Sequence, residues 1–215
     1  VDHYRNRPPG VHDHLRVAFN QSILNRLGDI LLNDKEIEKN REALTLFKEA
    51  SNLGRKVLAV ELGDPSIAQN YFASLLRVAT AHRQLAAKLS GTQQEAEYQN
   101  ALAVHAEVRQ FTEQQAAKPV ASPASVALWR SGVADAYMQE SITLDQRAEA
   151  QTGNPAARRR DLEQAIDLAE KAAVSLAAAF KGADVAENAQ HLDYWTKLEG
   201  NIQSSLTTLK GKLEP

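Results

Sequence analysis

The chain has 215 residues, 43% hydrophobic and 24% charged, which is typical of a folded globular protein and excludes disordered and collagen-like classes. Its 25 Lys and Arg against 27 Asp and Glu leave a formal net charge of −2, so no overall field attracts nucleic acid or anionic lipid. The absence of cysteine excludes disulfides, thiolate metal sites and cysteine nucleophiles. We expect a cytoplasmic protein without membrane insertion, although a cysteine-free chain suits the periplasm equally.

Residues 1–10 are expected to form an arm or linker, because they hold two prolines and a glycine without an apolar period. From residue 11 onward, apolar residues recur every three or four positions, which is typical of helices. The first helix should end near Asn33 and turn one apolar stripe toward the core. That stripe consists of Leu15, Phe19, Ser22, Ile23, Leu27, Ile30 and Leu31.

Short signals then divide the chain into further helices. Asn33 and Glu36 have the spacing of a capping box for the second helix. Three pairs combine a capping side chain with proline at the first helical position, which predicts a helix start. These pairs are Asp64-Pro65, Ser122-Pro123 and Asn154-Pro155. No segment alternates with the period of a strand, so the sequence predicts an all-α fold of about seven antiparallel helices in a single domain, residues 11–215.

Small residues recur at comparable places in three segments. The first segment reads Leu27-Gly28-x-x-Leu31, then Ala43-x-x-x-Phe47-x-x-Ala50, then Pro65. The second segment reads Val78-Ala79-x-x-His82, then Ala101-x-x-x-His105-x-x-Val108. The third segment reads Val133-Ala134-Asp135-x-Tyr137, then Ala165-x-x-x-Ala169-x-x-Ala172. Together they resemble the tetratricopeptide repeat, although the copies lie 51 and 55 residues apart and the family period is about 34 residues.

The resemblance implies three helical hairpins at about residues 11–62, 65–117 and 123–181, covered by a capping helix at 184–212. It also implies that small residues lie where paired helices touch. These are Gly28, Ala79 and Ala134 on the first helices, and Ala43, Ala101 and Ala165 on the second. The final helix should pack through a stripe of Leu192, Trp195, Leu198, Ile202, Leu206 and Leu209. A long-helix bundle with the same stripes is the alternative.

No motif points to catalysis, since nucleotide-binding, zinc-protease and nucleophile-elbow patterns are all missing from the sequence. His12 and His14 flank Asp13 in the arm, but their spacing of two splits them between helix faces. Other notable side chains are assigned to the core: His82, His105, Trp129, Tyr137 and Trp195. Met138 is expected at the surface and Arg158-Arg159-Arg160 on a solvated face. The sequence therefore predicts no catalytic residue, no metal site and no cofactor.

Stacks of this repeat leave their first helices lining a concave groove that holds a peptide or partner helix. The resemblance therefore implies a non-catalytic protein–protein interaction domain. The groove-facing positions that it implies are Asn25, Asp29, Leu32, Arg77, Thr80, Arg83, Gln84, Ser131, Asp135, Met138 and Gln139. Arg77 and Arg83 would form a basic centre between Asp29 and Asp135, which favours a ligand with acidic groups at its middle.

A second hypothesis comes from a different class. Because residue 1 is Val, we expect the chain to be excised from a longer one, such as a bacterial-type signalling protein. It would then be a regulatory or sensor domain that binds a small ligand or short peptide. A closed apolar pocket would favour the sensor and an open polar groove the scaffold. A buried carboxylate or histidine with a shifted pKa in a cleft would favour an enzyme.

Overall fold

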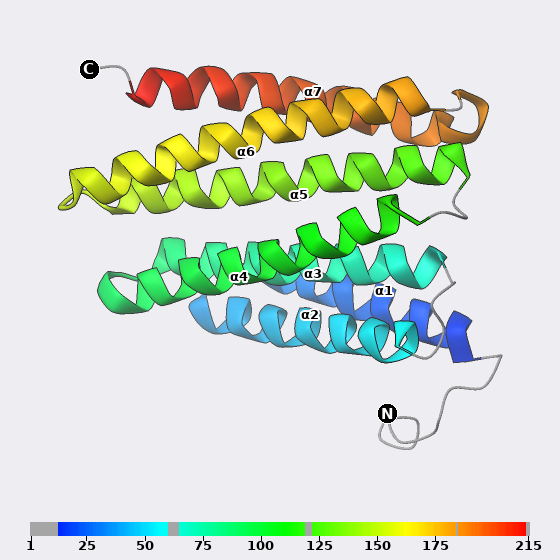
Figure 1. Cartoon of the computed structure of the whole chain (residues 1–215). Coiled ribbons are helices and arrows are strands. Elements are labelled where there is room, and N and C mark those ends of the chain that lie inside the picture. The colour runs from blue at the N-terminus through cyan, green and yellow to red at the C-terminus, as the bar shows by residue number, and fades with distance from the viewer. Residues whose placement is uncertain (1–12, 60–64, 119–121, 184, 214–215) are drawn as a thin grey trace. The chain divides into compact units, whose positions relative to one another are not determined.

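The computed structural model describes residues 13–59, 65–118, 122–183 and 185–213. Within these ranges the chain is all-α, which confirms the predicted fold class (Figure 1). The seven helices are α1 (Asp13–Leu32), α2 (Ile37–Leu58), α3 (Pro65–Lys88), α4 (Gly91–Ala116), α5 (Pro123–Ala150), α6 (Pro155–Gly182) and α7 (Val185–Leu213). Among the described residues, no helix combines the length and apolar character that crossing a membrane requires.

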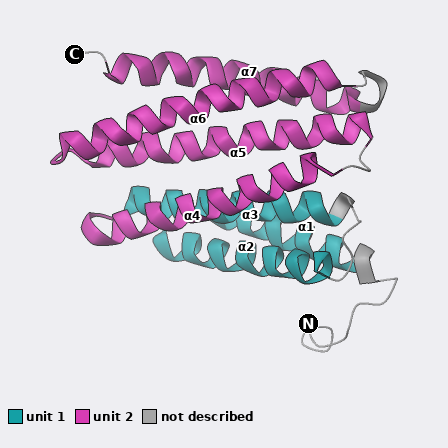
Figure 2. Ribbon diagram, viewed as in Figure 1, with its two compact units in different colours: residues 1–88 teal, residues 89–215 magenta. Residues whose placement is uncertain are grey.

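The helices form two compact units, residues 1–88 and residues 89–215 (Figure 2). In unit 1, α2 packs against both α1 and α3, and α1 also contacts α3. In unit 2, α5 contacts α4, α6 and α7, and α6 contacts α7. Consecutive helices within a unit run antiparallel. The boundary between the units falls inside the expected hairpin 65–117.

The helix starts follow the proline signals. Ser122 Oγ accepts a hydrogen bond from the backbone N–H of Ser125 at 3.2 Å, and Asn154 Oδ1 accepts one from Ala157 at 3.1 Å. Both caps were predicted and are confirmed, and α3 begins at Pro65 as expected, with Asp64 outside the described residues.

The capping box at Asn33 and Glu36 is wrong. Glu36 is itself the N-cap of α2, and its side chain makes no capping bond. The Asn33 amide instead donates to the carbonyl of Asp29 in the last turn of α1, at 2.9 Å. Asn33 is therefore used to end the first helix, so it does not begin the second.

The core of unit 2 lies between α5, α6 and α7. Trp195 is fully buried and meets Phe180 edge to face, with ring centroids 5.6 Å apart. The predicted stripe of α7 is confirmed: Trp195, Leu198, Ile202 and Leu209 are buried, and Leu192 and Leu206 pack against the same cores. Met138 is buried in this core, so its predicted surface position is wrong. Because α5 has neighbours on several sides, residues away from its main stripe are covered as well.

The small residues singled out in the sequence are all buried. At Gly28 a Cβ would lie 2.3 Å from the ring of Phe47, so α1 and α2 approach closely only because glycine stands there. His82, His105, Trp129 and Trp195 are buried as predicted, whereas Tyr137 is half-buried. Arg158, Arg159 and Arg160 are exposed, which confirms the solvated face, and Arg159 pairs with Glu163 at 2.8 Å.

Candidate functional site

Helix α1 packs through a face of small and polar residues. Its buried positions are Gln21, Asn25, Gly28 and Leu32. The two amides are held by bonds to the neighbouring helices: Gln21 Nε2 donates to the carbonyl of Ala50 on α2 at 3.1 Å, and Asn25 Nδ2 donates to Ser74 Oγ on α3 at 3.0 Å. These bonds and the contact between Gly28 and Phe47 fix which side of α1 faces inward.

The opposite side of α1 carries large apolar side chains in the open. Phe19 is 64% exposed, Ile23 40%, Leu27 47% and Ile30 69%. At about 100° per residue these four positions share one side of the helix. We call them the α1 row. The prediction that this stripe faces the core is therefore wrong for all four residues, and the side chain of Leu15 lies outside the described residues.

Basic residues border the α1 row. Arg26 is exposed one position before Leu27, and Arg16 projects from the same side of the helix as Ile23 by the helical period. The carboxylate of Asp29, the nearest acidic group along α1, is already neutralised: Arg77 Nε lies 2.9 Å from Oδ1 and Arg77 Nη2 lies 3.0 Å from Oδ2. Two basic side chains, Arg16 and Arg26, therefore lie next to the row, and of these Arg26 is the exposed one.

The expected groove residues of unit 1 lie at the contact of α1 with α3. Asn25, Asp29 and Arg77 are brought together, but they bind one another or Ser74. Leu32 is buried, and Thr80, Arg83 and Gln84 on α3 are half-buried. The guanidinium of Arg77 is thus engaged by Asp29 within the chain.

The expected groove residues of unit 2 lie on α5. Ser131, Asp135 and Met138 are buried, and Gln139 is half-buried. Asp135 accepts a hydrogen bond from the hydroxyl of Tyr194 on α7 at 2.8 Å. Burial raises the pKa of Asp135, although the bonds from Tyr194 and Gln139 oppose this shift. A partner would have to displace α7 to reach this carboxylate.

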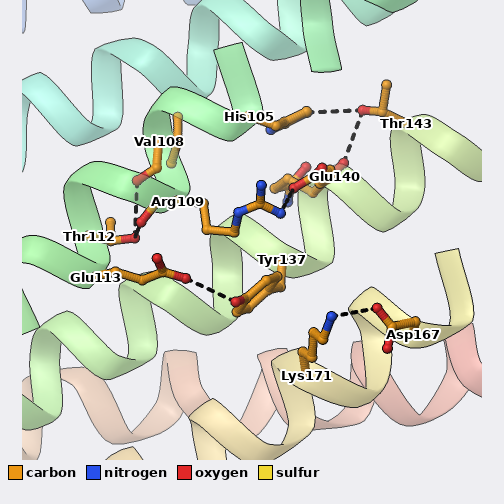
Figure 3. A network of polar contacts seen from close by, with 11 residues as sticks. His105, Val108, Arg109, Thr112, Glu113, Tyr137, Glu140, Thr143, Asp167 and Lys171 are labelled. Carbon is orange, nitrogen blue, oxygen red and sulfur yellow. Dashed lines mark hydrogen bonds and ion pairs between the residues drawn. The ribbon is translucent and has the colours of Figure 1, made fainter. Parts of the chain in front are cut away.

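A ladder of polar contacts joins α4 to α5 in unit 2 (Figure 3). Arg109 Nη1 lies 3.0 Å from Glu140 Oε2, and its guanidinium stands 5.6 Å from the centre of the Tyr137 ring. The Tyr137 hydroxyl donates to Glu113 Oε1 at 2.9 Å. Because the α4 members are four residues apart and their α5 partners run in the reverse direction, the ladder fixes the antiparallel register of the two helices.

His105 extends this ladder into the core. Its Nε2 lies 3.0 Å from Thr143 Oγ1, and the Thr143 hydroxyl donates to the carbonyl of Gln139 at 3.0 Å. Since that hydroxyl proton is already used, His105 Nε2 is the donor to Thr143. This bond gives the buried His105 ring a hydrogen-bond partner inside the unit, in line with the structural role predicted for it.

Glu140 is the buried carboxylate that an enzyme hypothesis would select. Burial raises its pKa, and the charges of Arg109 and Lys171 oppose the shift. Its carboxylate is engaged by Arg109, and Lys171 is bound to Asp167 at 2.6 Å. Within the described ranges, no three carboxylate or imidazole groups converge as a metal site would require; His12 lies outside those ranges, as do the side chains of Asp13 and His14. The contacts of this ladder hold α4 against α5.

A polar pocket of about 560 Å³ opens in unit 2 where α4, the end of α5 and the start of α6 meet. Its walls include Glu95, Arg147, Gln151, Arg160 and Asp161. The sequence patterns gave no indication of this pocket, because its residues come from three helices and the turn between α5 and α6, and they match no motif.

Comparisons with protein-family models, with curated proteins and with solved structures found no match to this chain. The function is therefore inferred from the arrangement of its own side chains.

Proposed function

We propose that the chain is a non-catalytic protein–protein interaction domain built of tetratricopeptide-like helical hairpins, and that the α1 row docks a helix of a partner protein. Antiparallel helix pairs and the buried small residues Gly28, Ala43, Ala134 and Ala165 are consistent with such hairpins. The observation that carries the proposal is the inverted helix α1, which buries amides and exposes Phe19, Ile23, Leu27 and Ile30.

This inversion is costly for an isolated domain. Each exposed large apolar side chain forgoes about 1.5–3 kcal/mol of burial, in proportion to the area left open. Single exposed apolar residues are common on surfaces, but four on one helix side make a continuous strip. A row at i, i+4, i+8 and i+11 has the spacing with which one helix contacts another. A partner helix recovers the unused burial energy.

The charges beside the row define the partner's chemistry. Arg26 and Arg16 lie beside the row, and Asp29 is neutralised by Arg77. A partner helix with an apolar stripe flanked by Glu or Asp complements both features, because the exposed Arg26 offers a cation at the rim of the contact. Lysine on the same flanks would face like charges. The occupant is therefore an acidic amphipathic helix.

Two designed helical peptides test this proposal. Both carry the same leucine stripe, one with glutamate and the other with lysine on its flanks, and binding is followed by fluorescence anisotropy. We expect the glutamate peptide to bind at least tenfold more tightly, and the double variant Ile23→Gln, Ile30→Gln to lose this binding. Val174→Gln is the matched control, because Val174 is an exposed apolar residue on α6, 71% accessible.

Three results would overturn the proposal. The first is equal affinity for both peptides, the second is binding that survives the double substitution, and the third is no binding of either peptide at 1 mM. Sedimentation of the protein without peptide gives a further check. If the unchanged protein is a dimer and the double variant is a monomer, a second copy of the chain covers the row.

A sensor domain is the second candidate function; the pocket of unit 2 offers it space for a ligand, but this pocket is polar, whereas the sensor hypothesis expects a closed apolar one. A pocket of that volume is large enough for a small metabolite. The two functions are compatible, since the α1 row and the pocket belong to different units.

A further inference from the structure

The apolar surface of the α1 row continues around α1 toward α2. At about 100° per residue, Leu31 lies about 40° and Leu24 about 60° from Leu27 around the helix axis. This is the side of Gly28, where α1 closely approaches Phe47 of α2. Both Leu24 and Leu31 are half-buried, so part of each side chain is still open to solvent.

The edge of the row toward α3 is polar instead. Arg26 is exposed on this edge, and Asp29 beside it is bound to Arg77 of α3. On the other edge, toward α2, Asn20 is an exposed polar residue near the start of the helix, and leucines follow it. The two edges of the row therefore differ in chemistry, with a cation toward α3 and apolar side chains toward α2.

Helix α2 extends this apolar surface beyond α1. Leu46 and Leu53 are seven positions apart, so they share one side of α2, and both are half-buried. Arg55 lies about 180° around the helix from Leu46, and its Nε donates to the Tyr71 hydroxyl of α3 at 3.3 Å. Leu46 and Leu53 therefore lie on the side of α2 away from α3, where they border the α1–α2 contact together with the two leucines of α1.

We propose that the partner helix packs against α1 and α2 together, so that its apolar face is broad and only one of its edges is acidic. The acidic edge lies over Arg26, and small or apolar side chains of the other edge cover Leu46 and Leu53. On α2, Lys39 is already paired with Glu42 at 3.4 Å, so an acidic residue over this edge gains no unbalanced charge there. The inference rests on the docking role proposed for the α1 row and defines the partner more narrowly.

Two designed helical peptides of equal length and equal net charge test the width of the apolar face. Both carry the same leucine stripe. The narrow peptide has glutamate on both edges, whereas the broad peptide has glutamate on one edge and leucine and alanine on the other, with the displaced glutamates moved to its outward side. We expect the broad peptide to bind the full chain about fivefold more tightly or better in fluorescence anisotropy, because it buries additional apolar surface.

Substitutions on α2 locate the additional contact. The double variant Leu46→Gln, Leu53→Gln should reduce the advantage of the broad peptide to less than about twofold and leave the affinity of the narrow peptide nearly unchanged. Leu44→Gln is the matched control, because Leu44 is another half-buried leucine of α2 but lies on the side of Arg55. Circular dichroism follows folding, and Leu46→Ala, Leu53→Ala gives the same readout without adding polar atoms if the glutamine variant unfolds.

The inference is overturned if the two peptides bind equally, if the broad peptide keeps its advantage on the Leu46, Leu53 variants, or if Leu44→Gln removes that advantage as well. In each of these cases the docking role of α1 would still stand if Ile23→Gln, Ile30→Gln abolishes binding of the narrow peptide. If neither peptide binds at 1 mM, the docking role fails and this inference fails with it.

Discussion

Helices α1 and α5 are both expected as first helices of hairpins, yet they solve opposite packing problems. Helix α5 contacts α4, α6 and α7, and residues all around it are buried, polar ones such as Ser141 and Thr143 included. Helix α1 contacts α2 and α3 and leaves the α1 row exposed. An apolar stripe thus predicts that one side of a helix packs against something. Whether a helix of the same unit covers that side depends on which helices lie next to it.

The largest expected difference comes from the same substitution on both helices. Leu144→Ala on α5 removes a fully buried side chain and should lower the free energy of unfolding by about 2–5 kcal/mol. Leu27→Ala on α1 removes a side chain that is already half exposed, so it should cost less than about 1 kcal/mol. Chemical denaturation measures both. A similar decrease in the free energy of unfolding for both variants would show that α1 and α5 do not differ in the burial of these leucines.

A pair of glycine substitutions sharpens the contrast on the inward side of α1. Gly28→Ala places a methyl group against the ring of Phe47 and should destabilise by about 1–3 kcal/mol. Gly200→Ala on α7 meets no atom within 4 Å, so the helix propensity of alanine should stabilise the protein by up to about 1 kcal/mol. Thermal melts of the two variants should move in opposite directions. An increase for both would mean that α1 and α2 are not in close contact at Gly28.

The carboxylate of Asp135 tests the packing of α5 against α7. Because burial raises its pKa in the folded state, the folded protein binds a proton more readily than the unfolded chain, whose Asp pKa is about 3.9. This group therefore contributes stability that increases as the pH falls from neutral toward the unfolded value.

Asp135→Asn removes that dependence and keeps an acceptor for the Tyr194 hydroxyl. We expect the variant to be more stable than the unchanged protein at pH 7.5, with the difference in the free energy of unfolding shrinking toward pH 4. Denaturation across this range measures the effect. A constant difference at all pH values would show that Asp135 is solvated and that α7 does not cover it.

Much of the fold was predictable because its signals are local. Proline with a capping side chain marks the starts of α5 and α6 within a few residues of sequence. The stripe of α7 was also correct, since only one side of that helix is apolar enough to face α5 and α6. The failure at Asn33 is of the same local kind, because an amide suited to capping can equally end the preceding helix.

The inward side of α1 could not be read from periodicity. It is fixed by the bond from Gln21 to Ala50 and the bond from Asn25 to Ser74, which join residues 29 and 49 positions apart. One signal was present: Gly28 was expected at a helix contact, although it lies almost opposite Phe19 on the helix. When a glycine at a helix contact and an apolar stripe lie on opposite sides of one helix, they indicate that each side packs against a different surface.

The pocket of unit 2 could not be predicted from the sequence either, because it also depends on residues that are far apart in the chain. Glu95 lies on α4, Gln151 directly after the end of α5 and Arg160 on α6, and only the meeting of these three helices places them around one space. The expected groove residues Ser131 and Met138 show the converse, because neighbours within unit 2 bury them. A repeat pattern therefore predicts which side of a helix a residue occupies, but it does not predict whether that residue is exposed to solvent.

The stability of the double variant Ile23→Gln, Ile30→Gln, measured without any partner, tests the central claim most directly. If the α1 row faces solvent in the free protein, the free energy of unfolding should stay within about 0.5 kcal/mol of the unchanged chain. Ile67→Gln, at a fully buried position of α3, is the control that should unfold the protein or destabilise it severely. A loss of more than about 2 kcal/mol in the double variant would contradict the account, since it would place the row inside the folded domain.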